Sequence, residues 1–359
     1  MKPTAPSGAR CIGAQFGVVE HVVVGGWEQD PARRPMPAVS LPCRPRMRFR
    51  MITFASRTYS GAKDLQSMID LLIAVRPTDR IADYPSVVDL REAFALTNVQ
   101  DSTRLWFDTN DQIVGFAFVD PYNNLRFEFD QQAAHPDIES EMITWGVEYI
   151  RCAMQESGES LTLDASCRDD DTERIALLGR HGFVMQEMRS LHMVRSLNEP
   201  IPTPRVPVGF SIRHVAGEYE VEALVALHCA AFGTENMTVE ERLAMMGVPE
   251  YDSELDLLVT APDDRFAAYC MCSISQEENE RTGRNEGYTD PVATHPDFQR
   301  RGLAQALLLT GFHKLKQRGI DVAVLGTSSE NIAMQRTAKA VGFRVQSTKL
   351  WFAKPVSQN

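Results

Sequence analysis

The chain has 359 residues, more than one typical hydrophobic core accommodates, so its length predicts two domains. Its formal net charge of −11 excludes a general affinity for nucleic acid or anionic membranes, because both require a basic protein surface. No apolar run approaches the length needed to span a bilayer, so neither nucleic acid nor a membrane is an expected partner.

The first segment, residues 1–50, is rich in Pro and Arg and shows neither helical nor strand periodicity. Its run VVEHVVVGG is a poor apolar core for a secretory signal. We predict a disordered extension, or a start codon assigned too early, with Met47 or Met51 as the true first residue. A cryptic targeting peptide is the less favoured interpretation.

The next segment, 51–197, has the pattern of an α/β unit. A strand-like run, NNLRFEFDQQAA, precedes His135-Pro136-Asp137, and a long helical stretch follows. A second strand, SLTLDAS, a short helix, Gly182-Phe183 and a last strand, VMQEMRSLHMV, complete the segment. The pattern predicts one domain.

A Pro-rich stretch, 198–207, separates this domain from a second one at 208–359. Its four prolines can neither continue a helix nor donate regularly to a sheet, so an extended linker is expected. Early in the second domain, an apolar helical stripe that includes His228 predicts a helix with this histidine in the core. Thr238 and Glu241 form a capping box at the start of the next helix.

The two domains share one spacing. His135-Pro136-Asp137 recurs as His295-Pro296-Asp297, a displacement of 295 − 135 = 160 residues. Gly182-Phe183 recurs as Gly342-Phe343, and 342 − 182 is again 160. The strands and helices between these motifs follow the same order, which indicates an internal duplication of the α/β unit.

The stretch HPDFQRRGLAQALL leads directly into a long helix with an apolar stripe from Leu303 to Leu315. No Ser, Thr, Asp or Asn stands immediately before this helix to cap it. A helix start with bare N–H groups favours an anion such as a phosphate. Gly302 allows close approach of the backbone, and Gln299, Arg300 and Arg301 add donors and positive charge. The stretch is neither a Walker A loop nor a GxGxxG turn.

Three features of this half resemble the GNAT superfamily of N-acyltransferases. They are this loop, the preceding strand end Val-Ala-x-His-Pro, and Asn331 at the head of the helix before Gly342-Phe343. Two such units in tandem resemble the double-GNAT arrangement of mycothiol synthase-like proteins. The resemblance implies two tandem α/β (α+β) units. Each would be a mixed, mostly antiparallel sheet with splayed central strands flanked by helices.

The resemblance also implies the activity. The protein would be an acyl-CoA-dependent N-acetyltransferase that moves an acetyl group from acetyl-CoA to a primary amine of a small molecule, by direct attack in 208–359. Backbone bonds to the pantetheine arm are expected from Val292, Ala293 and Thr294, and a contact to the CoA arm from Asn331. The pyrophosphate would be cradled by Gln299, Arg300, Arg301, Gly302, Leu303, Ala304 and Gln305. The alternatives are a plain charged turn and an Asn331 that only caps its helix, although one side chain can do both.

The same positions in the first domain differ. Subtracting 160 places Glu139 at the Gln299 position, Met142 at Gly302 and Thr144 at Ala304. The glycine is missing, and Glu139 and Glu141 bring negative charge to the expected pyrophosphate site, where they would repel it. We predict that 51–197 is a degenerate GNAT-like domain that packs against the other and shapes the substrate site.

For catalysis, a carboxylate that takes the proton of the amine is needed. Asp290 is the first candidate as base or amine-orienting group and Glu286 the second, on the same strand face with Tyr288 between them. An Asp290 that only caps a strand edge or a bulge beside Pro291 is the alternative. Family members often carry a tyrosine acid where this chain has Ala338, so Tyr288 or a water is left to protonate the CoA thiolate.

A second functional class stays open, a non-catalytic acyl-CoA-binding or regulatory protein, which an Ala338 in place of the acid also fits. The acceptor amine, the acyl chain preference and the oligomeric state are not predicted. The seven cysteines contain no CxxC pair and no zinc-type cluster, which indicates reduced thiols in a cytoplasmic protein and no metal. Cys270 and Cys272 are expected to be small core residues on one strand face.

Overall fold

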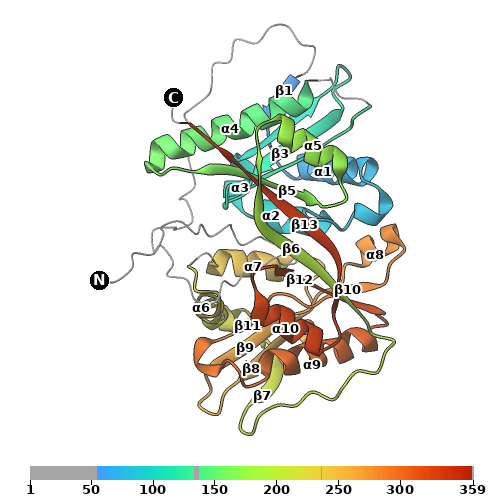
Figure 1. Cartoon of the computed structure of the whole chain (residues 1–359), viewed down its shortest axis with the longest axis vertical. Coiled ribbons are helices and arrows are strands. Elements are labelled where there is room, and N and C mark those ends of the chain that lie inside the picture. Colours follow the sequence, from blue (N-terminus) through green and yellow to red (C-terminus); the bar gives the residue numbers. More distant parts are fainter. Residues whose placement is uncertain (1–54, 133–136, 236, 358–359) are drawn as a thin grey trace.

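The structure is a computed structural model that describes residues 55–132, 137–235 and 237–357. The predicted extension 1–50 lies outside the described residues, and so does His135-Pro136 of the first repeat. Figure 1 shows an elongated molecule in which two α/β bodies lie one above the other, with the long strands β6 and β13 running between them. In the described ranges, no helix is both long enough and apolar enough to cross a membrane.

The first half of the chain follows the order predicted for one α/β unit. Its strands are β1 (Ala55–Thr58), β2 (Thr103–Phe107), β3 (Ile113–Val119), β4 (Leu125–Phe129), β5 (Thr162–Arg168) and β6 (Val184–Ser196). Its helices are α1 (Ala62–Val75), α2 (Val87–Phe94), α3 (Thr97–Asp101), α4 (Ile138–Ser157) and α5 (Thr172–Arg180), with a 3-10 turn η1 (Thr78–Arg80).

The second half repeats that order, except that one strand is broken in two, an additional helix precedes it, and the helices between the first two strands differ. Its strands are β7 (Ser211–His214), β8 (Asp256–Thr260), β9 (Phe266–Met271), β10 (Glu286–Tyr288), β11 (Val292–Thr294), β12 (Val322–Ser328) and β13 (Arg344–Pro355). Its helices are α6 (Val221–Phe232), α7 (Val239–Gly247), α8 (Gln276–Thr282), α9 (Leu303–Gln317) and α10 (Ile332–Ala340). Short 3-10 turns η2 (Glu218–Glu220), η3 (Ser253–Leu255) and η4 (Pro296–Phe298) complete it.

The helix caps carry the duplication into local structure. Asp171 caps α5 by accepting the N–H of Arg174, and Asn331 caps α10 by accepting the N–H of Met334. The two caps are again separated by 331 − 171 = 160 residues. The capping box predicted at Thr238 is confirmed, because its hydroxyl accepts the N–H of Glu241 while the Glu241 carboxylate accepts the N–H of Thr238.

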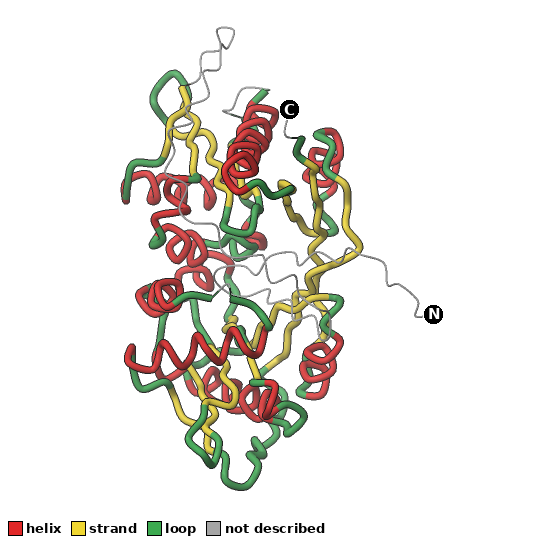
Figure 2. The backbone as a smooth tube through the Cα atoms, turned by 90° about the vertical axis from the view of Figure 1, so that its left-hand side faces the viewer, coloured by secondary structure: helices red, strands yellow, loops and turns green. Residues whose placement is uncertain are grey.

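Three sheets form the framework, and helices cover them on both sides (Figure 2). One is antiparallel with the order β1-β2-β3-β4, and another is antiparallel with the order β11-β9-β8-β7. Between them lies a five-stranded sheet with the order β10-β12-β6-β13-β5. The expected splayed central strands are present, because β10 pairs parallel with β12 whereas β11 pairs antiparallel with β9.

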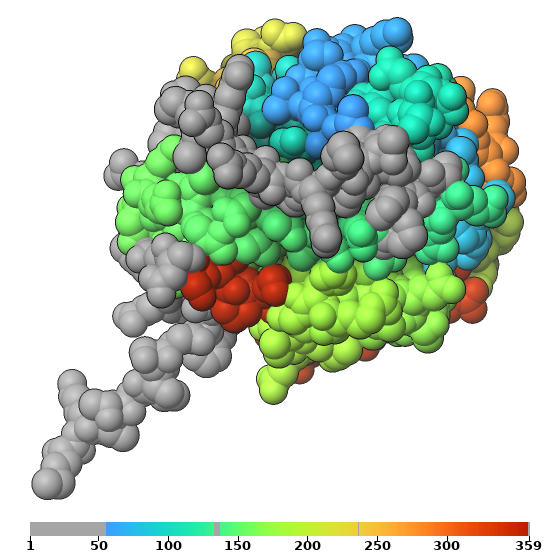
Figure 3. Space-filling view, turned by 90° about the horizontal axis from the view of Figure 1, so that it is seen from above, coloured from blue at the N-terminus to red at the C-terminus, as the bar shows by residue number. Residues whose placement is uncertain are grey.

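The last strand of each half belongs to the sheet of the other half. Strand β6 pairs with β12 over seven residues, and β13 pairs with β5 over seven residues and with β6. Seen from above in Figure 3, the C-terminal end of the chain lies between surfaces of the first half. The boundaries predicted from the repeat therefore divide the sequence into two copies, but the sheet does not follow that division.

The exchanged strands contribute to both hydrophobic cores. Met193 and Leu197 are fully buried in the core under α9, and Leu350 and Phe352 are buried in the core under α4. Each such side chain stabilises the fold by about 1.5–3 kcal/mol when it leaves water. The exchange of β6 and β13 between the halves is thus stabilised by side-chain packing in both cores, in addition to the backbone hydrogen bonds.

Two predictions about core residues are confirmed. His228 is buried, its Nδ1 lies 2.6 Å from the Tyr269 hydroxyl, and its ring packs on Phe232. Cys270 and Cys272 are buried free thiols whose sulfur atoms lie 3.7 Å apart on one strand face. The histidine and the two cysteines therefore contribute to the packing of the core, and none of the three is exposed.

Candidate active site

The central strands separate at residues 289–291. Tyr288 is the last residue of β10 and pairs with Val324, and the N–H and hydroxyl of Thr289 both donate to the Val324 carbonyl at 2.9 Å. After the cis peptide Asp290-Pro291 the chain pairs with β9 instead. An opening between β11 and the end of β12 results.

One side of this opening is a backbone edge. Strand β11, with Val292, Ala293 and Thr294, is the outermost strand of its four-stranded sheet. An edge strand presents backbone N–H and C=O groups that can pair with an extended ligand. The predicted role of these three residues toward the pantetheine arm is compatible with this position and stays a prediction.

The loop at the other end of β11 leads into α9 and has the shape of an anion site. Gln299 is extended, whereas Arg300 at φ 60° and Gly302 at φ 80° are both left-handed. Gly302 is the N-cap of α9, and no side chain caps this helix start, as predicted. Alternating left-handed residues before a helix turn several N–H groups toward one point, where the helix dipole also favours negative charge.

The side chains of the loop differ in their exposure. Gln299, Arg300, Arg301 and Gln305 are exposed, and Ala304 is half-buried. Arg301 lies 5.8 Å from the rings of both Phe210 and Phe298. Leu303 is buried in the core, so among the expected ligands it can contribute only through its backbone.

Asn331 is observed as a helix cap. Its side-chain oxygen accepts the N–H of Met334 at 2.9 Å, and the residue is buried. Because the oxygen serves the cap, a contact with the CoA arm would use the amide nitrogen. The capping role is confirmed, and the ligand contact stays a prediction.

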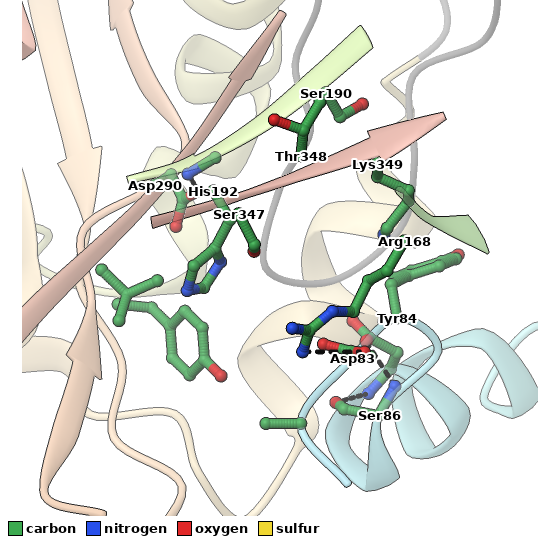
Figure 4. Close-up of a pocket in the computed structure, with 15 residues that line it drawn as sticks. Asp83, Tyr84, Ser86, Arg168, Ser190, His192, Asp290, Ser347, Thr348 and Lys349 are labelled. Carbon is green, nitrogen blue, oxygen red and sulfur yellow. Dashed lines mark hydrogen bonds and ion pairs between the residues drawn. The ribbon is translucent and has the colours of Figure 1, made fainter. Parts of the chain in front are cut away.

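Asp290 lies where the strands separate, and it is 2% exposed. Its Oδ2 accepts the N–H of Gly326 on β12 at 2.7 Å, so the carboxylate bridges the opening. Asp290 also lines a cavity between the two halves of the molecule (Figure 4), and Tyr288 belongs to the same lining. The structure thus places the first predicted base where the central strands separate and on the wall of a cavity.

Glu286 lines an adjoining cavity that also includes Tyr288. Burial raises the pKa of Glu286, while Arg284, whose guanidinium lies 3.4 Å away, opposes that rise. Burial also raises the pKa of Tyr288 well above its ordinary value. Both side chains therefore favour their neutral forms more than free side chains do.

Much of the cavity wall comes from residues that sequence reasoning did not single out. The first half contributes the η1–α2 segment, with Asp83, Tyr84, Ser86 and Asp89, and Arg168 at the end of β5. The exchanged strands contribute Ser190, His192, Ser347, Thr348 and Lys349. No local motif marks these positions, because they meet only through the exchange of β6 and β13.

The cavity is polar and contains charges of both signs. Burial raises the pKa of Asp83, although Lys349, Arg76, Arg168 and Arg80 oppose the rise. Burial raises the pKa of Asp89 to about 6, against hydrogen bonds from the N–H and hydroxyl of Ser86. A small polar molecule, rather than an apolar one, suits such a wall.

The position at which the family often has its tyrosine acid is part of the core. Ala338 is fully buried on α10, within the cluster that includes Phe312 and Phe343. A larger side chain would have to displace that packing. Over the residues that the structure describes, no group of three or more His, Cys, Asp or Glu side chains is arranged to hold a metal ion.

Comparisons with known proteins point to one family. Residues 221–343 match the Acetyltransferase (GNAT) family. A mycothiol acetyltransferase of Thermobispora bispora is 26% identical over 238 residues, which cover 65% of this chain and 77% of that protein. Matches to further mycothiol acetyltransferases span about half the length of those relatives.

Solved structures show the same fold. A GCN5-related N-acetyltransferase from Sphaerobacter thermophilus matches with a TM-score of 0.61 at 20% identity, over 86% of this chain and 98% of that one. A tandem GNAT protein from the clavulanic acid biosynthesis pathway matches with a TM-score of 0.56 at 12% identity, over 85% of this chain and 99% of that one. Both matches extend across the two halves of the chain.

Proposed function

We propose that this protein transfers an acetyl group from acetyl-CoA to the primary amine of a small molecule, because residues 221–343 match the Acetyltransferase (GNAT) family. One observation carries the proposal. The buried carboxylate of Asp290, the open edge of β11 and the uncapped start of α9 follow one another along the chain, and in this proposal they line the path of the cofactor. The path has a positive end for a pyrophosphate and a reactive end at the cavity.

In this proposal the loop before α9 holds the pyrophosphate through backbone N–H groups, with positive charge from Arg300 and Arg301. Val292, Ala293 and Thr294 pair with the pantetheine arm, and Asn331 contacts it through its amide nitrogen. The thioester then lies near residues 289–291. This places the acetyl carbon beside Asp290 and Gly326, at the mouth of the cavity between the halves.

The acceptor amine would enter from that cavity. The wall carries Asp83 and Asp89 as well as Arg168 and Lys349, which suits a small polar amine with hydrogen-bonding groups. The first half of the chain would thereby shape the acceptor site although it holds no acyl-CoA itself. The free thiols of the described cysteines are compatible with the expected cytoplasmic location.

The proposed chemistry is direct attack of the amine on the thioester. Asp290 accepts a proton from the ammonium form or orients the amine, and Glu286 is the second candidate for this role. Tyr288 is a candidate to protonate the departing CoA thiolate, because its high pKa keeps it protonated. The protons balance because the ammonium loses two of them: the CoA sulfur gains one, and the other passes through the base to solvent.

The competing function is that of a non-catalytic acyl-CoA-binding or regulatory protein. The buried Ala338 favours it, because the usual tyrosine acid is absent from that position. The two functions differ in whether acetyl-CoA is consumed. Release of CoA from acetyl-CoA in the presence of a panel of small amines, measured with a thiol reagent, separates them.

The role of Asp290 is tested with the variant Asp290→Asn, which keeps the shape but removes the basicity. The turnover rate should fall by roughly a hundredfold or more, with partial recovery at high pH where the amine is already neutral. Binding of acetyl-CoA, measured by calorimetry, should stay near wild type. Glu286→Gln serves as the comparison. Normal turnover by Asp290→Asn beside an inactive Glu286→Gln would transfer the role to Glu286.

A further inference from the structure

A histidine from the first half of the chain faces the proposed reaction centre. His192 lies on the exchanged strand β6 and pairs directly with Gly326 of β12 on one side and with Ser347 of β13 on the other. Gly326 is also the residue whose N–H donates to Asp290. His192 and Asp290 therefore flank the same glycine from opposite sides.

The absence of a side chain at Gly326 is important for this arrangement. Residues on neighbouring strands have Cβ atoms about 5 Å apart, so a side chain at 326 would stand between the carboxylate and the imidazole. With glycine there, the space between them is left to the cavity, whose lining includes all three residues. Figure 4 shows the His192 ring directed from β6 into the cavity, on the side where Asp290 and Ser347 lie.

The surroundings of His192 keep its ring neutral at physiological pH. Burial lowers its pKa to about 4, and the positive charges of Lys349, Arg284 and Arg168 act in the same direction. Gln346 shares a side-chain hydrogen bond with the ring. A neutral imidazole with one nitrogen engaged offers the other as a proton acceptor.

The reaction requires such an acceptor. After Asp290 or solvent has taken the first proton from the ammonium, attack on the thioester carbon leaves a second proton on the positively charged nitrogen of the adduct. That proton must leave as the amide forms, and the sulfur must gain one as the C–S bond breaks. Ala338 cannot take part, since it carries no polar atom and is buried in the core.

We propose that His192 is a catalytic residue of the acetyl transfer, which accepts the second amine proton from the tetrahedral adduct and passes it to the CoA sulfur. The inference rests on the proposed function and extends it, because it assigns part of the chemistry to the first half of the sequence. The N–C bond forms, the C–S bond breaks, and the imidazole ends each turnover neutral. No other reactant is needed.

The first test uses matched histidine variants. His192→Gln should lower kcat by roughly a hundredfold or more while the affinity for acetyl-CoA stays within about twofold, because the lost group acts on protons. His214→Gln is the control, since His214 is exposed on β7, in a different sheet. Added imidazole should restore part of the kcat of His192→Ala. A purely structural role would give no such rescue.

Tyr288→Phe is run beside these variants. If it abolishes turnover while His192→Gln turns over normally, the thiolate proton comes from the phenol and the proposal for His192 is wrong. If the wild-type protein binds acetyl-CoA but does not consume it with any amine of the panel, the proposed function fails instead. The two failures are therefore distinguishable.

A second test needs no acceptor amine. In protein with isotope-labelled histidine, the ring signals of His192, assigned by comparison with His192→Gln, should shift when acetyl-CoA binds. The signal of His214 should not move. Saturation with acetyl-CoA that leaves the His192 signal unchanged would place the thioester away from the imidazole and overturn the proposal.

Discussion

The starts of helices α4 and α9 occupy equivalent places in the two halves and have opposite properties. Subtracting 160 from Leu303, where α9 begins, gives 143, but α4 already begins at Ile138, five residues earlier. In the second half these residues form the left-handed loop with Gly302, and in the first half they are helix. The anion loop has been replaced by an additional helical turn.

The opening between the central strands differs as well. Glu128 stands where the second half has Tyr288, since 288 − 128 is again 160. Its carboxylate lies 2.6 Å from Arg76 and 3.1 Å from Arg174. Burial alone would raise the pKa of Glu128, but these two guanidinium groups hold it below its ordinary value. A buried ion network thus stands in the first half at the position where the second half has Tyr288 on the cavity wall.

The first turn of α4 adds negative charge. Glu141 accepts the indole N–H of Trp106 at 3.1 Å, and Glu139 pairs with Arg180 at 3.2 Å. Met142, at the Gly302 position, is fully buried, and its methyl group packs against Gly115 of β3. Acidic residues stabilise a helix start but repel a phosphate there. The difference teaches that two halves with the same order of elements can differ at an equivalent helix start in length, charge and packing at once.

The largest expected effect comes from separating the halves. The fragment 208–359 lacks β6, so β12 loses its neighbour and the core under α9 loses Met193 and Leu197. We expect no cooperative thermal unfolding and no measurable acetyl-CoA binding. The fragment 184–359, which keeps β6, should recover part of both. A fragment 208–359 that folds and binds like the whole chain would show that the exchange is not needed.

The next effect concerns the loop that only the second half retains. Gly302→Glu should weaken acetyl-CoA binding by about 2–3 kcal/mol, or about 30- to 150-fold, because it places a negative charge at the pyrophosphate. Gly302→Gln is the matched control, with the same size and the same left-handed backbone strain of about 1 kcal/mol. Calorimetry at two salt concentrations measures the acetyl-CoA affinity of both variants. If the two variants lost the same affinity for acetyl-CoA, charge at this position would be irrelevant and the pyrophosphate would bind elsewhere.

A smaller effect is expected where the halves touch. Glu278 of α8 is buried and accepts the N–H of Val88 on α2 at 3.5 Å. Burial raises its pKa from 4.5 to about 7, with the charge of Asp89 acting in the same direction and a hydrogen bond with Ser86 against it. Between these two pH values the folded chain holds a proton that the unfolded chain has lost. Stability should therefore fall as the pH rises through this window.

Glu278→Gln should remove that pH dependence and raise the free energy of unfolding at pH 8 by about 1–2 kcal/mol, with little change at pH 4. Denaturant unfolding at both pH values measures it. Glu280→Gln, on the exposed side of the same helix, is the control. If the free energy of unfolding fell with rising pH as steeply in Glu278→Gln as in the wild type, the pH dependence would come from other groups.

The smallest expected effect is a null result in the first half. Removing both acids with Glu139→Gln and Glu141→Gln should leave one acetyl-CoA bound per chain, as in the wild type. The additional helical turn and the Arg76–Glu128–Arg174 network would still close the site. Titration calorimetry gives the stoichiometry. Two bound molecules in this double variant would show that charge alone had closed the first site.

The sequence by itself determined the elements and the main loop. The displacement of 160 between His-Pro and Gly-Phe motifs predicted the duplication, and the structure extends it to the caps Asp171 and Asn331. The uncapped start of α9 and its left-handed Gly302 follow from local chemistry, because turns, caps and apolar stripes depend on neighbouring residues. Local patterns also placed Asp290, Tyr288 and Glu286 on one strand segment.

Only the tertiary structure decided which strands pair and what faces the reaction centre. Strands β6 and β13 have similar apolar patterns, and nothing in a strand's own residues says which of two similar sheets it will join. Their exchange brings His192 beside Gly326 and places Arg168 and Asp83 on the cavity wall. His192 and Gly326 are 326 − 192 = 134 positions apart in the chain, and the packing of both cores at once decides that they pair.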